Sequence, residues 1–479
     1  MKYIKKILIV FFLLNVIVFP QENIERLKYQ LDTLLSGSFF QSILAAVDIY
    51  DLTSHEALYK RNERMLLNPA SNMKILTTSS ALLFLDPDYR FNTNIYYSGN
   101  ILSKILNGDL YIIGGGDPLF KTSDLDSLVK MIKETGLKEI NGNIYADVSW
   151  KDSLFWGDGW MWNDDPSTDA PYLSALNINE NSIEVLVSPT SFGKKADVYL
   201  NPETGYVNII NKTITTYSDG ENNYEVTRDW INRKNTIIVG GLVRNIPIID
   251  SAKFWQGINI FNPAMYFTTL FSERLIKDGI KFDGIIGIKT TPESALRLTN
   301  YYHSLDSVIV NTNKPSYNLG AEMLLYALAV NDSGKPATAK NGLAAINNLI
   351  TLVGLNPENY SLADGSGISR YNLVSPELIL SVLKYLYENK PQLYKRFYYS
   401  LPIAGIDGTI KNRMLDTPAQ NKVHAKTGTL SGVSALSGYV TSKNNHDIVF
   451  SIMIQNYVGK SSTAKGYEDK ICEMLASYE

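Results

Sequence analysis

The segment Asn68-Pro69-Ala70-Ser71-Asn72-Met73-Lys74 opens the helical pattern around which the rest of the chain is arranged. Asn is a preferred helix cap and Pro suits a first turn, so a helix is predicted to begin here and to run to Leu85. A spacing of three places the hydroxyl of Ser71 and the amine of Lys74 on one face. A serine becomes a nucleophile when a base takes its proton, and an amine can be that base when burial or a nearby cation lowers its pKa. The spacing alone is weak evidence, since it recurs at Ser127, Ser191, Ser381 and Ser462.

Strand patterns at both ends of the chain predict a shared sheet. Two of them, at residues 43–50 and 57–61, precede Ser71, and three follow near the C-terminus, at 423–426, 433–441 and 447–455. Helical patterns accompany them at 22–35, 262–277, 318–329, 342–353, 375–388 and 462–478. We therefore expect one sheet with helices on both faces and a long insertion that leaves from one edge.

The middle of the chain has a different texture, with short alternating strands and turns. Strand patterns occur at 182–187, 196–200, 205–210 and 236–243, and one clear helical pattern spans 124–136. We predict a β-rich insertion at residues 87–270, built from two nested subdomains. A discontinuous domain of residues 22–86 and 271–479 would then surround it.

Residues 1–21 have the pattern of a signal peptide, with basic residues followed by an apolar run at 7–19. The run is too short to span a bilayer comfortably. We predict export to the periplasm or cell envelope. The usual small-residue cleavage pattern is missing, so an uncleaved membrane anchor stays open as the alternative. Peripheral association with the membrane or the cell wall also stays open. Cys472 is the only cysteine, so no intramolecular disulfide can form.

Charge and motif content exclude several function classes. The formal net charge is −3 and the sequence pI is about 6.0, whereas a nucleic-acid-binding protein usually carries a basic face. The chain has four histidines but no His-Glu-x-x-His zinc pattern, and it lacks a Gly-x-Ser-x-Gly nucleophile elbow. We expect no metal, no cofactor and no nucleic-acid partner.

A second short motif, Ser316-Tyr317-Asn318, follows Pro315 at the start of a helical pattern. Ser and Asn both cap helices, and capping is the simpler interpretation. In the alternative interpretation, the Ser316 hydroxyl relays a proton towards a leaving amine while Asn318 holds a substrate amide.

A third motif, Lys426-Thr427-Gly428-Thr429, ends a strand pattern and is the one Lys-Thr-Gly of the chain. Gly428 on an edge strand would let a substrate backbone approach and pair with it. Lys426 supplies positive charge, and the hydroxyls of Thr427 and Thr429 could bind a carboxylate. The simpler interpretation is an ordinary hairpin end with a solvated lysine.

The order Ser-x-x-Lys, Ser-x-Asn, Lys-Thr-Gly is the motif set of β-lactamases and penicillin-binding proteins. The chain resembles the class C penicillin-binding proteins of the penicillin-binding protein 4 type, which also have a long gap between the first two motifs. Four further blocks look like blocks of that family, at 364–370, 401–409, 114–118 and 160–164.

The resemblance implies an α/β (α+β) fold, with a β-lactamase/transpeptidase-like domain whose central antiparallel sheet is flanked by helices. It implies a serine-type D-Ala-D-Ala carboxypeptidase with Ser71 as nucleophile and Lys74 as general base. Ser316 and Lys426 would pass a proton to the leaving D-Ala. The residues that would bind substrate are Asn318, Thr427, Gly428, Thr429, Arg370, and Asp164, which matches an aspartate facing the amine-bearing side chain of the stem peptide.

The same resemblance implies peptidoglycan stem peptides as substrates and β-lactam antibiotics as covalent inhibitors at Ser71. Endopeptidase action on peptide cross-links uses the same serine, so it stays open beside carboxypeptidase action. A β-lactamase or esterase on this scaffold is an alternative against which the large insertion argues. A non-catalytic wall-binding or β-lactam-sensing protein is another, against which the intact motifs argue.

Overall fold

The computed structural model describes residues 22–246 and 255–479, so the predicted signal peptide lies outside the described residues. The chain divides into two compact units. Unit 1 comprises the described residues up to Leu83 together with Ile309–Tyr317 and Ile346–Glu479. Unit 2 comprises Phe84–Val308 and Asn318–Ala345. The predicted insertion, 87–270, falls inside the first segment of unit 2, and its boundaries stay a prediction.

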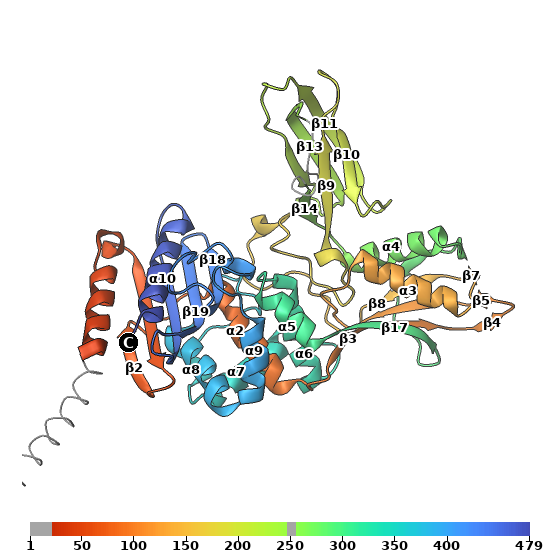
Figure 1. Cartoon of the computed structure of the whole chain (residues 1–479). Coiled ribbons are helices and arrows are strands. Elements are labelled where there is room, and N and C mark those ends of the chain that lie inside the picture. The colour runs from red at the N-terminus through yellow and green to blue at the C-terminus, as the bar shows by residue number, and fades with distance from the viewer. Residues whose placement is uncertain (1–21, 247–254) are drawn as a thin grey trace, which may run out of the picture. The chain divides into compact units, whose positions relative to one another are not determined.

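Unit 1 is built around a five-stranded antiparallel sheet (Figure 1). From one edge to the other, the strands are β18 (Val423–Leu430), β19 (Val433–Thr441), β20 (Asp447–Gln455), β1 (Leu44–Asp51) and β2 (Glu56–Arg61). β1 pairs along its whole length with β20, from Leu44 opposite Gln455 to Asp51 opposite Ile448. The two ends of the chain therefore share one sheet, as the strand patterns predicted.

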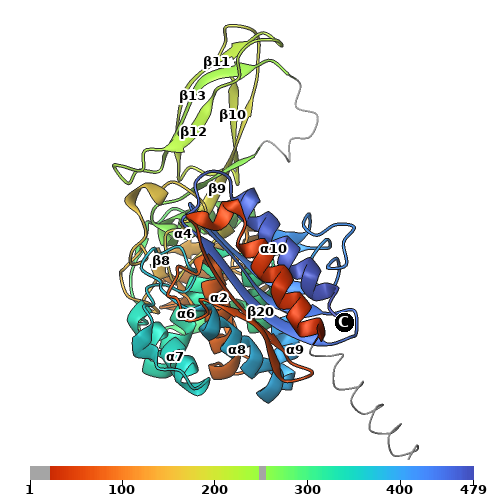
Figure 2. The same cartoon turned by 90° about the vertical axis from the view of Figure 1, so that its left-hand side faces the viewer.

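One face of this sheet packs against two helices, which lie side by side in Figure 2. They are the red helix of residues 22–35 and the blue helix α10 (Ser461–Ala476). Side chains alternate between the two faces of a strand, so Val47 and Ile49 both point to this side. They are fully buried in one apolar cluster with Leu31 and Ile471 of the helices.

The opposite face carries α8 (Pro376–Asn389), with α9 (Pro391–Ser400) following it in sequence. The segment that contains Ser71 also lies here, where the buried Asn72 side chain donates a hydrogen bond of 2.8 Å to Ser437 of β19. Ala70–Asn72 is a short 3-10 turn, and α2 begins one residue later, spanning Met73–Phe84. The side chain of Asn68 accepts a hydrogen bond of 2.9 Å from the Ala70 amide, so it holds the backbone that leads into this turn and does not cap α2.

Unit 2 contains four sheets within its described residues. The largest has the order β16 (Ile286–Ile288), β8 (Ile144–Asp147), β6 (Leu110–Gly114), β3 (Arg90–Tyr97), β17 (Leu296–Ser304), and α3 (Thr122–Glu134) and α4 (Pro263–Lys277) pack on it. A second has the order β15 (Lys281–Phe282), β7 (Glu139–Asn141), β5 (Ile105–Asn107), β4 (Asn100–Leu102). The other two are three-stranded: β10 (Asp197–Asn201), β9 (Ser182–Ser188), β14 (Gln256–Asn259); and β11 (Asn208–Thr216), β13 (Thr236–Arg244), β12 (Glu225–Arg228).

The remaining helices are α5 (Leu305–Asn313), α6 (Asn318–Ser333) and α7 (Ala339–Leu352). Across residues 22–246 and 255–479, none of the helices combines the length and apolar character needed to cross a bilayer.

Candidate active site

Ser71 and Lys74 form the first pair of the candidate site. The Lys74 side chain is fully buried, and its Nζ donates hydrogen bonds of 2.8 Å to Ser71 Oγ and 2.7 Å to the carbonyl oxygen of Ser366. Once Lys74 loses a proton, the Ser71 bond can reverse its direction, because a neutral amine has a lone pair to accept the hydroxyl proton. The geometry therefore suits proton transfer from Ser71 to Lys74.

The block at 364–370 holds the carbonyl that Lys74 uses. The buried carboxylate of Asp364 accepts hydrogen bonds from the backbone amides of Gly367 at 2.8 Å and Ser369 at 2.7 Å, which bends the chain tightly around Ser366. Gly367 has a φ of 86°, and a Cβ there would collide with the Ala70 carbonyl. In the sequence this block indicated only the family. In the structure it also positions the Ser366 carbonyl, which is a hydrogen-bond partner of Lys74.

Gly428 explains how the edge strand β18 approaches the serine. A Cβ at this position would lie 2.6 Å from the Pro69 carbonyl oxygen and 3.1 Å from the Ser71 amide nitrogen. The backbone of the Ser71 turn therefore lies directly against Gly428, where only a hydrogen fits.

Ser316 and Lys426 form the second pair. Lys426 is fully buried, and its Nζ donates hydrogen bonds of 2.8 Å to Ser316 Oγ and 2.9 Å to the Thr427 carbonyl oxygen. Burial, and then the positive charge of Lys74, lowers the pKa of Lys426 well below its ordinary value. The ammonium of Lys426 therefore gives up a proton more readily than an exposed lysine does.

The block at 401–409 supports this second pair. Lys314, two residues before Ser316, forms an ion pair of 2.6 Å with Asp407, and its carbonyl accepts the Thr409 amide at 3.1 Å. The Thr427 hydroxyl donates to the Thr409 hydroxyl at 2.8 Å. Both sides of the Ser316–Lys426 pair are thus tied to one turn, a role that its sequence alone did not reveal.

Two residues of the site have left-handed backbone conformations. Ala70, which precedes the nucleophile candidate, has a φ of 44°, and Ser316 has a φ of 67°. Such conformations cost non-glycine residues roughly 1 kcal/mol or more and tend to gather at functional sites. At Ser316 this backbone leaves the hydroxyl bonded to Lys426, while α6 begins two residues later.

His424 lies two residues before Lys426 on the same face of β18. Its ring stacks on Tyr398, with centroids 4.0 Å apart and planes 16° apart. Burial, helped by the positive charge of Lys314, lowers the pKa of His424 to about 4. The ring is therefore neutral at neutral pH and adds no charge beside Lys426.

The other predicted substrate-binding residues are distributed between the two units. In unit 1, exposed Thr429 of β18 lies opposite Ser434 of β19, and exposed Arg370 donates a hydrogen bond of 3.2 Å to the Ser431 carbonyl in the β18–β19 turn. In unit 2, Asn318 begins α6 and donates to the Asp169 carbonyl at 2.6 Å, and Asp164 accepts from the Met161 amide at 2.8 Å. That these residues bind substrate stays a prediction.

A central antiparallel sheet between helical layers, with Lys-Thr-Gly on its edge strand and Ser-x-x-Lys against that strand, is characteristic of the penicillin-recognising serine enzymes. The chain belongs to one family of this class, the D-Ala-D-Ala carboxypeptidase 3 (S13) family, whose profile matches residues 27–478. The predicted family, the α/β fold class and the assignment as a D-Ala-D-Ala peptidase are confirmed.

Individual relatives agree with this assignment. The chain is 31% identical over 471 residues to a D-alanyl-D-alanine carboxypeptidase from Actinomadura sp., covering 95% of this chain and 85% of that one. Its structure is similar to penicillin binding protein 4 from Haemophilus influenzae, with a TM-score of 0.82 and 27% identity over 94% of this chain and 99% of that chain. A second structure of that protein, complexed with a β-lactam, gives a TM-score of 0.76 at 26% identity, with the same coverage.

Proposed function

We propose that this enzyme hydrolyses the bond between the last two D-alanines of peptidoglycan stem peptides through an acyl-enzyme on Ser71. One observation carries the proposal. Each of two fully buried lysine amines lies 2.8 Å from a serine hydroxyl, Lys74 from Ser71 and Lys426 from Ser316. One pair can activate a nucleophile, and the other can deliver a proton to a leaving group.

In the acylation step, Ser71 Oγ attacks the carbonyl carbon between the two D-alanines while its proton passes to neutral Lys74. Negative charge then develops on the carbonyl oxygen. The backbone amides of Ser71 and Thr429 are our candidates for the oxyanion hole, and losing one such donor typically raises a barrier by about 3 kcal/mol.

Collapse of this intermediate breaks the C–N bond, and the departing nitrogen takes up a proton. We assign that proton to the Lys426 ammonium, relayed through the Ser316 hydroxyl, because burial has made Lys426 a stronger acid than an ordinary lysine. The proton that Lys74 took from Ser71 passes on to Lys426, so that Lys74 is neutral again and Lys426 is an ammonium again. Water then attacks the Ser71 ester, Lys74 accepts the proton of that water, and this proton passes to Ser71 Oγ as the ester bond breaks. The products are the shortened stem peptide and free D-Ala.

The remaining site residues would position the substrate. Thr427, Thr429 and Arg370 supply donors for the terminal carboxylate, the Thr427 hydroxyl by turning away from Thr409, and the substrate backbone pairs with the edge of β18 at Gly428. In the same proposal Asn318 holds a substrate amide and Asp164 faces the amine-bearing side chain of the stem peptide.

A β-lactam would acylate Ser71 in place of the peptide, and the structure of a related protein in complex with a β-lactam supports this part of the proposal. We also propose that the enzyme is exported under the direction of residues 1–21 and acts in the cell envelope, where it associates with the wall or the membrane surface.

Labelling with fluorescent penicillin tests the nucleophile. The chain offers a matched control, because Ser462 begins another Ser-x-x-Lys on the exposed side of α10. The unaltered protein and Ser462→Ala should both label, whereas Ser71→Ala should not. Persistent labelling of folded Ser71→Ala would show that another residue is acylated.

Mass spectrometry of wall fragments incubated with the unaltered protein tests the reaction. Loss of one terminal alanine from monomeric stem peptides is expected for carboxypeptidase action. Splitting of cross-linked dimers would add endopeptidase action by the same serine. If neither product forms while penicillin still labels Ser71, the protein is a β-lactam sensor and the proposed hydrolysis is wrong.

A further inference from the structure

Unit 2 contains an aromatic pocket that the proposed reaction does not use. Its volume is about 330 Å³, at the small end of the roughly 300–1,000 Å³ range of small-molecule sites. Its walls come from the segment that follows β8 and from the turn between β12 and β13. The aromatic side chains that line it are Phe155, Trp156, Trp162, Tyr172 and Trp230.

Of the rings that line the pocket, Trp162 is exposed to solvent and Trp230 is half-buried. Trp162 is 72% exposed, and its ring centroid lies 5.0 Å from that of Trp230 with the planes 35° apart. The two indoles are therefore tilted and do not cover each other as parallel rings would. Elsewhere in unit 2, Phe192 and Tyr217 stack at 3.8 Å and 13°, so each of these rings covers a face of the other. An exposed apolar surface of this kind usually marks a binding site.

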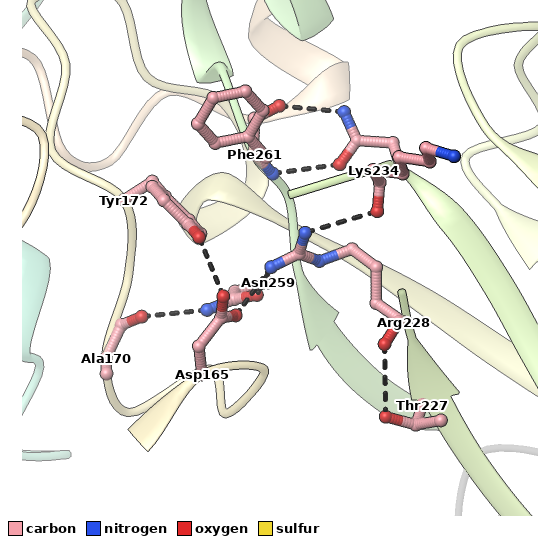
Figure 3. A network of polar contacts seen from close by, with 9 residues as sticks. Asp165, Ala170, Tyr172, Thr227, Arg228, Lys234, Asn259 and Phe261 are labelled. Carbon is pink, nitrogen blue, oxygen red and sulfur yellow. Dashed lines mark hydrogen bonds and ion pairs between the residues drawn. The ribbon is translucent and has the colours of Figure 1, made fainter. Parts of the chain in front are cut away.

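Two residues that line the pocket, Asp165 and Tyr172, belong to a buried network of charges and hydrogen bonds (Figure 3). Asp165 pairs with buried Arg228 at 2.5 Å and accepts a hydrogen bond of 2.7 Å from the Tyr172 hydroxyl. Arg228 also donates to Asn259 Oδ1 at 3.1 Å, and Asn259 donates to the Ala170 carbonyl at 2.9 Å. Both oxygens of the lining carboxylate are therefore occupied, and its charge is neutralised.

The charge offered to a ligand is positive. The guanidinium of Arg233, which is exposed, lies over the Phe155 ring at 5.2 Å from its centroid. It can donate hydrogen bonds to neutral or anionic oxygens and would repel a protonated amine. The pocket thus suits a ligand with an apolar face, acceptor oxygens and no positive charge.

We propose that this pocket binds an N-acetylated amino-sugar ring of the glycan strand from which stem peptides extend. The axial C–H groups of a pyranose form an apolar face that can pack on an indole, whose electron-rich face attracts them. The acetamido carbonyl supplies an acceptor for Arg233, and acetylation removes the positive charge of the amine. The inference rests on the proposed function for its choice of polymer, but it does not involve Ser71.

Calorimetric titration of the full chain with a trimer of N-acetylglucosamine, and with the same trimer deacetylated, tests the proposal. The acetylated trimer should bind saturably in the millimolar range or tighter, and the deacetylated trimer at least tenfold more weakly when its amines are protonated. Trp230→Ala and Trp162→Ala should each weaken binding at least tenfold. Tyr217→Ala, an equally large change at a stacked exposed pair, should bind as the unaltered protein does. Circular dichroism checks that each variant is folded.

The inference would be overturned by equal affinity for the two trimers, by unchanged affinity in both folded tryptophan variants, or by self-association that either tryptophan change abolishes. In the last case the pocket is an interface between copies of this chain. Binding of a sugar-free stem peptide in its place, lost in Trp230→Ala, would also overturn it.

The two proposals fail in distinguishable ways. Ser71→Ala should lose penicillin labelling and keep the trimer affinity, whereas Trp230→Ala should lose the affinity and keep turnover of a small sugar-free peptide. Labelling without sugar binding rejects only the pocket, and sugar binding without labelling rejects only the catalytic proposal.

Discussion

Two buried cations, Arg228 in unit 2 and Lys426 in unit 1, have opposite electrostatic surroundings. Arg228 of unit 2 pairs with a carboxylate at 2.5 Å and also donates hydrogen bonds to Asn259 and to the Lys234 carbonyl. Lys426 of unit 1 is bonded to a hydroxyl and a carbonyl, and none of the ion pairs found among the described residues includes it. The nearby charge that acts on it is another cation, Lys74.

This difference separates a structural charge from a reactive one. A buried charge with a carboxylate partner is held in one protonation state, since losing the proton would leave the partner uncompensated. A buried amine among neutral groups and beside another cation has its pKa lowered and gives up its proton more readily. The catalytic proposal requires the second arrangement, and the pocket wall of unit 2 requires the first.

The strongest test of this contrast replaces Lys426 by arginine. Arginine keeps the positive charge but holds its proton at any working pH, so it cannot relay one. We expect kcat/KM on a D-Ala-D-Ala peptide to fall about 10³-fold, roughly 4 kcal/mol of barrier. Lys443→Arg is the control, because that lysine is exposed. Activity within about threefold of the unaltered enzyme, where three-fold is roughly 0.6 kcal/mol, would mean that charge alone suffices at Lys426.

Arg228→Ala tests the other side of the contrast. Removing it leaves Asp165 buried and uncompensated, and we expect the free energy of unfolding, measured in urea, to fall by about 3 kcal/mol. The rate of penicillin acylation should not change. The double variant Asp165→Asn/Arg228→Met, which removes both charges, should be more stable than Arg228→Ala, and the opposite order would contradict a structural ion pair.

Tyr172→Phe should have a smaller effect of the same kind. It deletes the 2.7 Å hydrogen bond to the Asp165 carboxylate but keeps the buried ring. Loss of one hydrogen bond to a charged group predicts a decrease of about 2 kcal/mol in the urea unfolding free energy. Tyr217→Phe, whose side chain lies in an exposed stacked pair, should leave that free energy unchanged.

The smallest expected effect concerns pH and His424 in unit 1. Its folded pKa of about 4 lies below the ordinary value of 6.5, so between these values the unfolded chain takes up a proton that the folded chain does not. Stability should therefore fall as the pH drops from 7 to 5, with His424 responsible for about 1 kcal/mol after allowance for solvent screening. His424→Gln should reduce that fall in stability. If the unaltered protein and the variant show the same pH dependence, His424 does not cause the fall.

Local patterns explain why so much of unit 1 could be predicted. Alternation in β19 and β20 and the 3.6-residue period of α8 are imposed by burial of one face, and the structure gives 433–441 and 447–455 the predicted bounds. Asn68 illustrates the limit of such reasoning. Its capping tendency is local, but the 3-10 turn that follows it forms where the backbone packs against Gly428 and Gly367.

No local sequence pattern predicted the charge network of unit 2. Asp165, Arg228 and Asn259 are separated by long stretches of chain, and each residue type is ordinary on an exposed turn or strand. The same holds for the Ser366 carbonyl that accepts from Lys74, because a backbone atom leaves no trace in residue identity.

The sequence by itself determined the family, the serine and lysine one helical turn apart, and the strand that bears Lys-Thr-Gly, because each depends on spacing within a few residues. Only the tertiary structure decided that buried Arg228 has a carboxylate partner, that buried Lys426 has a hydroxyl and a carbonyl as partners, and that Trp162 stays exposed. Those outcomes depend on which distant segments pack together, and packing sets the local dielectric, the neighbouring charges and the exposed surface.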